Sequence, residues 1–433
     1  MNTLIKNGLV LTMAGMEPET VVGDIGITDT VIEFVGEKHP AFHADRIIHA
    51  EGKIVLPGLV NAHTHSAMSL FRHTADDLPF WEWLHDRIFP LEEALTPEYA
   101  YWGSLLSIAE MIRSGTTTFA DMYFFMDKTA DAVLSSGIRA NLSRGLLTEE
   151  GGTFAKIEEG AELHNKWHGK GEGRIRVDLG PHAPYTCSPE YLEQIVKTAK
   201  ELNTGIHIHL SESRKELETI KEQYGLSPVE YLDKAGIFDL NTLAAHCVYL
   251  SDSDMEILKR KGVNVLNNPG SNLKLGNGFA PVQRLLKEGI NVCLGTDGPA
   301  SNNNLNMFEE ISLAALINKG ITEDPTAVPA YEALRMATIN GAKALGRENE
   351  TGSIEPGKKA DIILVDTEKP HFYPKGDPFA SLVYSAQASD VCTVICNGRV
   401  LMDENRLLTV DEKELLVKVS EIGKKLKRET VSS

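Results

Sequence analysis

The chain has 433 residues, of which 42% are apolar and 24% are charged, as is ordinary for a globular protein. Its formal charge of −18, from 43 basic and 61 acidic residues, argues against nonspecific binding to nucleic acid, because a phosphate backbone needs a basic face. The five cysteines form no C-x-x-C pair, and no stretch has the apolar length of a signal peptide or a membrane span. We therefore expect a cytoplasmic protein without disulfides, with neither nucleic acid nor membrane as a partner.

Residues 1–56 have the pattern of short strands joined by turns, and no long helical period interrupts them. The stretch LIKNGLVLTM contains Asn7-Gly8, a dipeptide that is typical of a two-residue hairpin turn. The stretches GDIGITDTVIEFVG and RIIHAEGKIVLPG continue the pattern. We expect a small β unit here.

Residues 57–350 alternate β-rich runs with amphipathic helical stretches, which predicts a (β/α)₈ barrel. The eight runs are IVLPGLVNAHTH, TTTFADM, IRANLSRGL, IRVDLGPHAP, GIHIHLSE, TLAAHCVYL, VNVLNNPGSN and INVCLGTDG. In such barrels the active site lies at the carboxyl ends of the strands. Each run ends in polar or ionisable residues, namely His63 and His65, Asp121, Arg144, His182, His209 and Glu212, His246, Asn268 and Asn272, and Asp297.

A long insertion, DDLPFWEWLHDRIFPLEEALTPE, separates the first two β runs. Its aromatic residues Phe80, Trp81 and Trp83 stand beside acidic residues. The pattern fits a surface helix that packs its aromatic side chains and fits a substrate lid equally well.

Residues 351–433 return to a β pattern, with TGSIEPGKKADIILVD followed by VCTVICNGRVLMDENR. The Asn397-Gly398 dipeptide predicts a hairpin, and VDEKELLVKVSEIGKKLKRE predicts a final helix. Neither chain end is large enough for a core of its own, so we expect the two β pieces to share one small domain.

The strand-end histidines suggest a metal site. Residues i and i+2 of a strand point to the same side, so His63 and His65 converge. With His209 and Asp297 from two other strand ends they form a set that suits one Zn²⁺ or Fe²⁺ ion and leaves a position for water. Such an ion lowers the pKa of a bound water to about 7. His207 faces inward too, and we expect it to fill the barrel.

The ordered motifs HTH, HLSE, AAHC, GTDG and GSIEPGKKADIILVD resemble the amidohydrolase superfamily over essentially the whole chain. The resemblance implies a metal-bearing (β/α)₈ barrel at 57–350, flanked by a β-sandwich built from residues 1–56 and 351–433. Dinuclear members carry a lysine after strand four, where this chain has DLGPHAPYTC. The resemblance therefore implies a single metal.

Within the superfamily the chain is similar to the 5′-methylthioadenosine/S-adenosylhomocysteine deaminases. The stretches that carry this similarity include DDLPFWEWLHDRIFPLE, SRGLL, GPHAPYTCS, NPGSNLKLGNGFAPV and GTDGPASNNNLNMF. The similarity implies hydrolytic removal of the adenine C6 amino group from a small adenine nucleoside thioether, with adenosine as a further candidate substrate.

The same similarity implies a role for each matching residue. His63, His65, His209 and Asp297 match metal ligands. Glu212 matches the acid at the ring nitrogen, and His246 matches the histidine that orients water. Glu92 matches the carboxylate that binds the ribose hydroxyls, His182 matches a nucleoside contact, and Arg144 matches a contact of the homocysteine carboxylate. From the chemistry of the site we also expect Asp297 to take a proton from the water and to return it to the departing amine. Where relatives carry a second arginine, this chain offers Lys156, a point charge instead of a bidentate fork.

Several alternatives remain open at this stage. Glu212 fits an acid at a helix N-terminus, His246 fits a fifth ligand or a core residue, and Arg144 fits an ion pair with Glu149 or Glu150. Guanine and triazine deaminases or chlorohydrolases use a similar ligand set, and a metal-free scaffold protein is a more distant alternative. The oligomeric state is open, with a homo-oligomer as one option.

Overall fold

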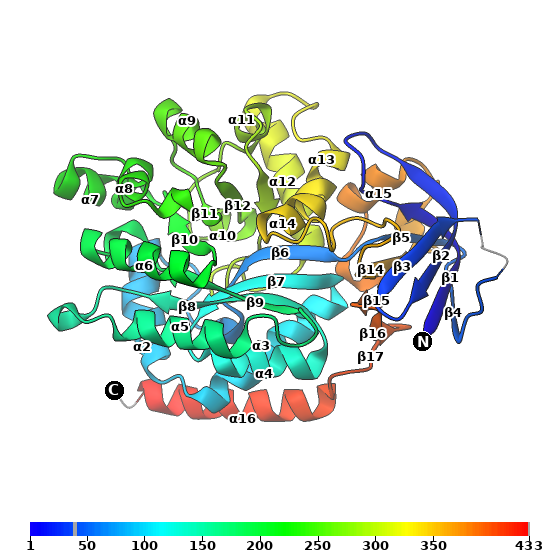
Figure 1. The fold of residues 1–433 in the computed structure, drawn as a ribbon, viewed down its shortest axis with the longest axis horizontal. Coiled ribbons are helices and arrows are strands. Elements are labelled where there is room, and N and C mark those ends of the chain that lie inside the picture. The colour runs from blue at the N-terminus through cyan, green and yellow to red at the C-terminus, as the bar shows by residue number, and fades with distance from the viewer. Residues whose placement is uncertain (38–40, 432–433) are drawn as a thin grey trace.

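The structure is a computed structural model that describes residues 1–37 and 41–431. It contains an eight-stranded parallel sheet and a nine-stranded mixed sheet that lie side by side (Figure 1). The parallel sheet corresponds to the predicted barrel, and the mixed sheet corresponds to the β segments predicted at the two chain ends.

The eight predicted β runs form the parallel sheet in chain order, which confirms the predicted barrel. Its strands are β6 (Leu59–Thr64), β7 (Thr116–Tyr123), β8 (Arg139–Leu146), β9 (Ile175–Pro181), β10 (Ile206–Leu210), β11 (Thr242–His246), β12 (Asn264–Asn267) and β13 (Val292–Leu294). Nearly every strand residue is buried, as expected when helices cover a parallel sheet.

The barrel closes between β13 and β6. The N–H of Asp297 donates to the carbonyl of His63 at 3.0 Å, and the N–H of Thr296 donates to Oδ1 of Asn61 at 2.9 Å. A Cβ on Gly295 would lie 2.7 Å from the His63 nitrogen, so only glycine permits this approach. The closure places the eighth strand end directly beside the first histidine pair.

Helices follow most barrel strands and begin at serine caps. The side chains of Ser188, Ser213 and Ser251 each accept the backbone N–H of the residue three positions later. Gly225 and Gly262, which have positive φ, end two of these helices. The helices between β6 and β14 (Ile362–Asp366), apart from the short α1 (Phe80–Glu82) and α2 (Phe89–Glu93), are α3 (Pro97–Arg113), α4 (Met126–Ser136), α5 (Ala155–Trp167), α6 (Pro189–Leu202), α7 (Arg214–Tyr224), α8 (Pro228–Lys234), α9 (Asp252–Lys261), α10 (Pro269–Lys274), α11 (Val282–Lys287), α12 (Met307–Thr322), α13 (Ala330–Met336) and α14 (Ile339–Ala344).

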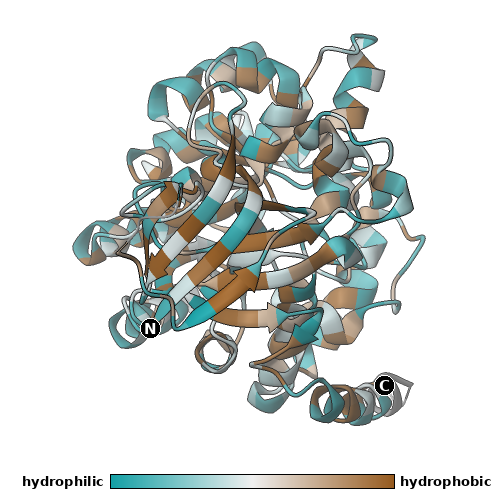
Figure 2. Cartoon of the chain, turned by 90° about the vertical axis from the view of Figure 1, so that its right-hand side faces the viewer, coloured by the Kyte–Doolittle hydropathy of each residue, from teal (hydrophilic) through white to brown (hydrophobic). Residues whose placement is uncertain are grey.

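Both chain ends build the mixed sheet, as predicted, and its strands share one buried core cluster. Hydrogen bonds join its members into one sheet in the order β17-β16-β15-β14-β5-β1-β2-β3, with β4 paired to β1. Hydrophobic and hydrophilic residues alternate along its strands (Figure 2). The strands are β1 (Asn2–Leu11), β2 (Thr20–Thr28), β3 (Val31–Gly36), β4 (Arg46–His49), β5 (Lys53–Pro57), β14 (Ile362–Asp366), β15 (Val391–Cys396), β16 (Arg399–Asp403) and β17 (Arg406–Leu407).

Two local predictions are wrong. Asn7-Gly8 makes no hairpin, because β1 runs through it and absorbs the positive φ of Asn7 (58°) in a bulge between Ile5 and Gly8. The run IVLPGLVNAHTH is two strands that separate at Gly58, β5 in the mixed sheet and β6 in the barrel. The domain boundaries at 56/57 and 350/351 stay predictions.

The remaining expectations concern the C-terminal segment and the cysteines. Asn397 and Gly398, with φ of 50° and 74°, form the predicted hairpin between β15 and β16. The final helix is α16 (Glu412–Val431), which packs along α3 on the barrel (Figure 1). All five cysteines lie in the described residues as free, buried thiols. In the described residues, no helix is long and apolar enough to span a membrane.

Candidate active site

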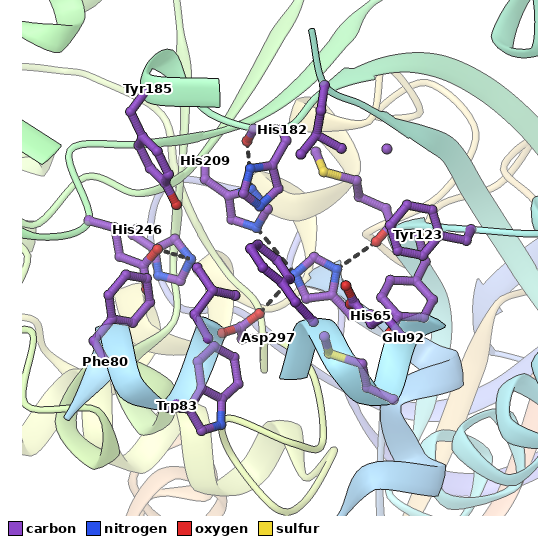
Figure 3. Close-up of a pocket in the computed structure, with 18 residues that line it drawn as sticks. His65, Phe80, Trp83, Glu92, Tyr123, His182, Tyr185, His209, His246 and Asp297 are labelled. Atoms are coloured by element: carbon purple, nitrogen blue, oxygen red, sulfur yellow. Dashed lines mark hydrogen bonds and ion pairs between the residues drawn. The ribbon is translucent and has the colours of Figure 1, made fainter. Parts of the chain in front are cut away.

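A pocket opens at the carboxyl ends of the barrel strands, with about 680 Å³ of empty space that includes the open solvent at its mouth. Histidine, aspartate and glutamate side chains line its inner end, and aromatic and aliphatic side chains line the rest (Figure 3). Its lining residues are His65, Met68, Phe80, Trp83, Leu84, Phe89, Glu92, Met122, Tyr123, Phe124, Gly145, Leu147, His182, Tyr185, His209, Glu212, His246 and Asp297.

The four residues predicted as metal ligands come together at the inner end. Oδ1 of Asp297 lies 3.3 Å from Nε2 of His63 and 3.2 Å from Nε2 of His65. Nε2 of His65 lies 3.2 Å from Nε2 of His209. Donor atoms from three strand ends thus lie close together: those of His63, His65 and Asp297 lie within 4.8 Å of one another, and His209 lies beside His65.

The outer nitrogens of two of these histidines are held by the backbone. Nδ1 of His65 bonds the carbonyl of Met122 at 2.5 Å, and Nδ1 of His209 bonds the carbonyl of His182 at 2.7 Å. Such partners fix the ring orientation and leave Nε2 as the coordinating atom. Both side chains therefore have the arrangement typical of histidine ligands.

His63 supplies the test of whether a metal fits. Its Nδ1 lies 2.8 Å from Nε2 of His207, so the histidine predicted to fill the barrel also orients His63. Nε2 of His63 is buried and has no hydrogen-bond partner. Burial lowers the pKa of His63 to about 4, so the ring is neutral. A neutral, buried and unpartnered nitrogen that faces two imidazoles and a carboxylate fits a divalent metal ion.

Two serine hydroxyls orient the Asp297 carboxylate. Oδ2 accepts hydrogen bonds from the hydroxyls of Ser271 at 2.6 Å and Ser301 at 2.7 Å, which leaves Oδ1 toward the histidines. Burial alone would raise the pKa of Asp297, but the imidazoles of His63 and His65, 3.3 and 3.2 Å from its Oδ1, hold that pKa well below its usual range. The carboxylate is therefore charged, as both a ligand and a proton acceptor must be.

His246 lies beside this cluster and faces Glu212. Its ring nitrogens can also reach a common point with those of His63 and His209, so the fifth-ligand alternative stays open. Nδ1 bonds Oδ1 of Asn272 at 2.9 Å, and Nε2 lies 3.8 Å from Oε2 of Glu212. The residue has a φ of 74°, a strained conformation that is typical of functional sites.

Glu212 points into the pocket and does not cap the helix that follows it. Asn277 donates to its Oε1 at 2.8 Å, and the residue is 7% exposed. Burial, reinforced by the charge of Asp297, raises the pKa of Glu212 to about 8. The carboxyl therefore holds a proton at neutral pH and can donate it.

Glu92 and His182 line the pocket, as predicted for substrate contacts. Glu92 belongs to the short helix α2 (Phe89–Glu93) and lies on the side of His65 and Tyr123 (Figure 3). Burial raises the pKa of Glu92 to about 7. Nδ1 of His182 lies 3.1 Å from the hydroxyl of Thr186, which leaves Nε2 for a ligand.

Arg144 lies outside this pocket, in an adjoining cleft that also contains Lys156. The two hollows share Phe89, Glu92, Phe124 and Leu147 as walls. Nε of Arg144 donates to Glu159 at 3.1 Å, and its guanidinium lies 5.2 Å from the centre of the Phe124 ring.

Glu149, one of the two residues predicted as an ion-pair partner of Arg144, does not pair with it. That carboxylate accepts the backbone N–H of Lys156 at 3.1 Å instead. The side chain of Glu150 lies outside the described part of the chain. The pairing with Glu159 comes from the next helix, α5, so sequence proximity gave no signal for it.

The insertion after β6 covers the pocket mouth. It folds as α1 (Phe80–Glu82), the π-helix η2 (Trp83–Ile88) and α2, and it contributes five wall residues including Phe80 and Trp83. Of the two interpretations of this segment, the structure favours a cover over the substrate site. Trp81 does not line the pocket and stacks on His85.

The sequence patterns missed several wall residues. Tyr123 ends β7 and lines the pocket, one residue after the predicted run TTTFADM stops. Asp121 itself turns away and accepts hydrogen bonds from Thr64 and Ser66 behind the histidines. Tyr185 lies in a short 3₁₀ turn after β9, and no spacing rule singles it out.

A closed parallel barrel with a histidine–aspartate cluster at its strand ends defines a class of metal-dependent hydrolases. The chain belongs to the amidohydrolase family, whose model matches residues 54–401. It is 54% identical to a 5-methylthioadenosine/S-adenosylhomocysteine deaminase of Thermoanaerobacter pseudethanolicus, over 98% of this chain and 99% of the relative. It is 52% identical to a protein of the same name from Caldanaerobacter subterraneus, over the full length of both.

Solved structures share the fold. An adenosine deaminase from Xanthomonas campestris with bound zinc has a TM-score of 0.94 and 33% identity, with 98% of each chain covered. The atrazine chlorohydrolase of Arthrobacter aurescens, complexed with zinc, has a TM-score of 0.91 and 26% identity, covering 97% of this chain and all of the other. The scaffold therefore occurs with two different hydrolytic activities.

Proposed function

We propose that this protein is a zinc-dependent aminohydrolase that deaminates the adenine ring of 5′-methylthioadenosine and S-adenosylhomocysteine. The observation that carries the proposal is the pairing of the histidine–aspartate cluster with a protonated carboxyl, Glu212, in one pocket. The names of relatives at 52–54% identity over the whole chain support the substrate class. In the reaction a C6–O bond forms, the C6–N bond breaks, and ammonia leaves.

The proposed metal holders are His63, His65, His209 and Asp297. A single divalent ion bound there supplies Lewis acidity, which makes water a nucleophile near neutral pH. Zinc suits three imidazoles and one carboxylate, and Fe²⁺ shares this preference. The zinc-bound solved relatives support zinc.

Three residues handle the protons in this proposal. Glu212 gives its carboxyl proton to the adenine ring nitrogen, which makes C6 electrophilic. His246 orients the attacking water through Nε2, and the Asp297 carboxylate takes a proton from that water. Asp297 then returns the proton to the departing amino group, which leaves as ammonia, and the second proton of the water restores the Glu212 carboxyl as the C6 carbonyl forms.

Substrate contacts follow from the pocket walls. Glu92 accepts hydrogen bonds from the two ribose hydroxyls, which a carboxylate can bind in a bidentate manner. His182, which also lines the pocket, makes a further contact with the nucleoside. Arg144, in the adjoining cleft, binds the carboxylate of the homocysteine tail, which methylthioadenosine lacks.

The test measures, on the zinc-loaded protein, the change in absorbance of each substrate together with the release of ammonia or, for the triazine, of chloride. Methylthioadenosine, S-adenosylhomocysteine, adenosine, guanine and a chlorotriazine are compared side by side. We expect the thioether nucleosides to have the highest kcat/KM. Turnover of the free base or the triazine alone would assign the site to a guanine deaminase or a chlorohydrolase instead.

A further inference from the structure

Glu216 is a buried carboxylate that the proposed reaction does not use. It lies in the first turn of α7 and is 1% exposed. Its Oε1 accepts the N–H of Ser211 and its Oε2 accepts the N–H of Glu212, each at 2.9 Å. One carboxylate therefore holds two successive peptide groups of the segment that carries the proton donor.

We propose that Glu216 is the positioning residue for Glu212, setting the place of its carboxyl through the backbone. The inference rests on the proposed function, because it takes Glu212 as the group that protonates the substrate. Glu216 itself does not line the pocket. It acts through the loop and not on the substrate.

The loop between β10 and α7 needs such an anchor. Only three residues connect Leu210, which ends the strand, to Arg214, which begins the helix. Ser211 has a φ of 52°, a left-handed conformation that a residue with a Cβ adopts only under external constraint. The two hydrogen bonds to Glu216 supply that constraint on either side of the Ser211 carbonyl.

The same turn connects the two residues that face each other in the pocket. The carbonyl of Ser211 accepts the N–H groups of Val248 and Tyr249, at 3.1 and 3.0 Å, just after His246. The side chain of Glu212 is then fixed by Asn277, whose own carbonyl accepts the Tyr249 hydroxyl at 2.5 Å. Glu212 is thus held at two points: Glu216 binds its backbone N–H, and Asn277 binds its carboxyl group.

The burial of Glu216 sets it apart from an ordinary capping residue. Burial raises the pKa of Glu216 to about 7, although both N–H donors favour its charged form. Glu230 makes the ordinary contact: in the first turn of α8 it accepts one N–H, from Ser227 at 2.8 Å, and it is half-buried. It does not line the pocket and is a matched control.

The experiment compares Glu216→Gln with Glu230→Gln in the full-length, zinc-loaded enzyme. Glutamine presents an NH₂ group where a backbone N–H needs an acceptor, so the first variant loses one anchor of the loop. We expect its kcat for methylthioadenosine to fall about 10- to 100-fold, with KM changed by less than about threefold and the metal content unchanged. Glu230→Gln should keep the wild-type kcat. Equal kcat values in the two variants would overturn the inference.

A second measurement does not depend on turnover. Amide hydrogen exchange should show Ser211 and Glu212 as protected as the residues of β10 in the wild type, and at least about tenfold less protected in Glu216→Gln. Unprotected wild-type amides would overturn the inference even if the variant failed to fold. If the wild type deaminated no nucleoside, the proposed function would fail, while the exchange data would still decide whether Glu216 anchors the loop.

Discussion

Glu212 is the residue on which the proposed chemistry depends most. Glutamine at this position keeps the shape and the Asn277 contact but has no acidic proton. We predict that Glu212→Gln loses about 10²- to 10⁴-fold in kcat, the usual contribution of a general acid, while its zinc content matches the wild type. Steady-state kinetics and metal analysis on the same sample check this. A near-wild-type rate would remove Glu212 from the acid role.

The raised pKa of Glu212, about 8, also predicts a pH dependence. The carboxyl must be protonated to donate, so the active form persists through neutral pH and is lost as pH rises through about 8. We expect kcat/KM for methylthioadenosine to fall about tenfold per pH unit on that alkaline side. A profile that stays flat to about pH 10 would contradict the assignment.

Substitution of Arg144 should affect S-adenosylhomocysteine and methylthioadenosine differently. Its guanidinium lies 16% exposed in the cleft beside the pocket and is free to exchange Glu159 for a substrate carboxylate. We predict that Arg144→Ala lowers kcat/KM for S-adenosylhomocysteine by about tenfold or more, the worth of a charge-assisted hydrogen bond, and leaves methylthioadenosine within about twofold. Equal losses on both substrates would show that Arg144 does not bind the tail.

Among the individual site residues, the sequence could predict those whose placement follows from strand geometry. Alternation places His63 and His65 on one side, and barrel topology brings strand ends together, so the cluster could be predicted. The Glu159 partner of Arg144 and the wall residue Tyr185 could not, because both depend on how a helix and a turn pack against the barrel.

The cover segment from α1 to α2 is the element that shapes the pocket mouth. Trp83, 5% exposed, forms part of the wall there. We predict that Trp83→Ala raises the KM for methylthioadenosine roughly fivefold, as loss of about 1 kcal/mol of aromatic contact requires, and leaves zinc binding intact. Trp102→Ala, on α3 and away from the pocket, is the control, and an equal change in KM there would contradict the role of Trp83.

Elements could be predicted where their period was clear, as in the eight barrel strands. Turn dipeptides were less reliable, because tertiary context decides between a hairpin and a bulge. Asn397-Gly398 turns the chain between two short strands, whereas Asn7-Gly8 lies inside a strand that β2 and β5 flank on both sides. The break at Gly58 did have a local signal in the dipeptide Pro57-Gly58, but apolar residues continue on both sides of it and made the run look like a single strand.

At the scale of the whole molecule, one buried ion pair joins the barrel to the mixed sheet. Arg139 begins β8 and makes a bidentate contact, at 2.9 Å for each bond, with Asp361 just before β14. We predict that Asp361→Asn destabilises the fold by about 3–5 kcal/mol, because the arginine is left charged and buried. Thermal unfolding checks this, with Glu412→Gln as the control.

Glu412 pairs with Arg113 at the surface, where both side chains are at least 36% exposed. Such a pair contributes about 0–1 kcal/mol. An equal fall in the unfolding temperature for the two variants would contradict the structural role of the Arg139–Asp361 pair. The sharing of one domain by both chain ends was predictable, but this link was not, since its partners lie 222 positions apart.

The proposed deaminase works with one metal ion per chain. The most direct test measures metal content and methylthioadenosine turnover on one sample, as purified, after chelation, and after zinc is returned. We predict one ion per chain, loss of turnover with the ion, and recovery in proportion to the zinc bound. Turnover that survives complete removal of the metal, or that requires two ions per chain, would show that the protein is not a deaminase with a single metal ion.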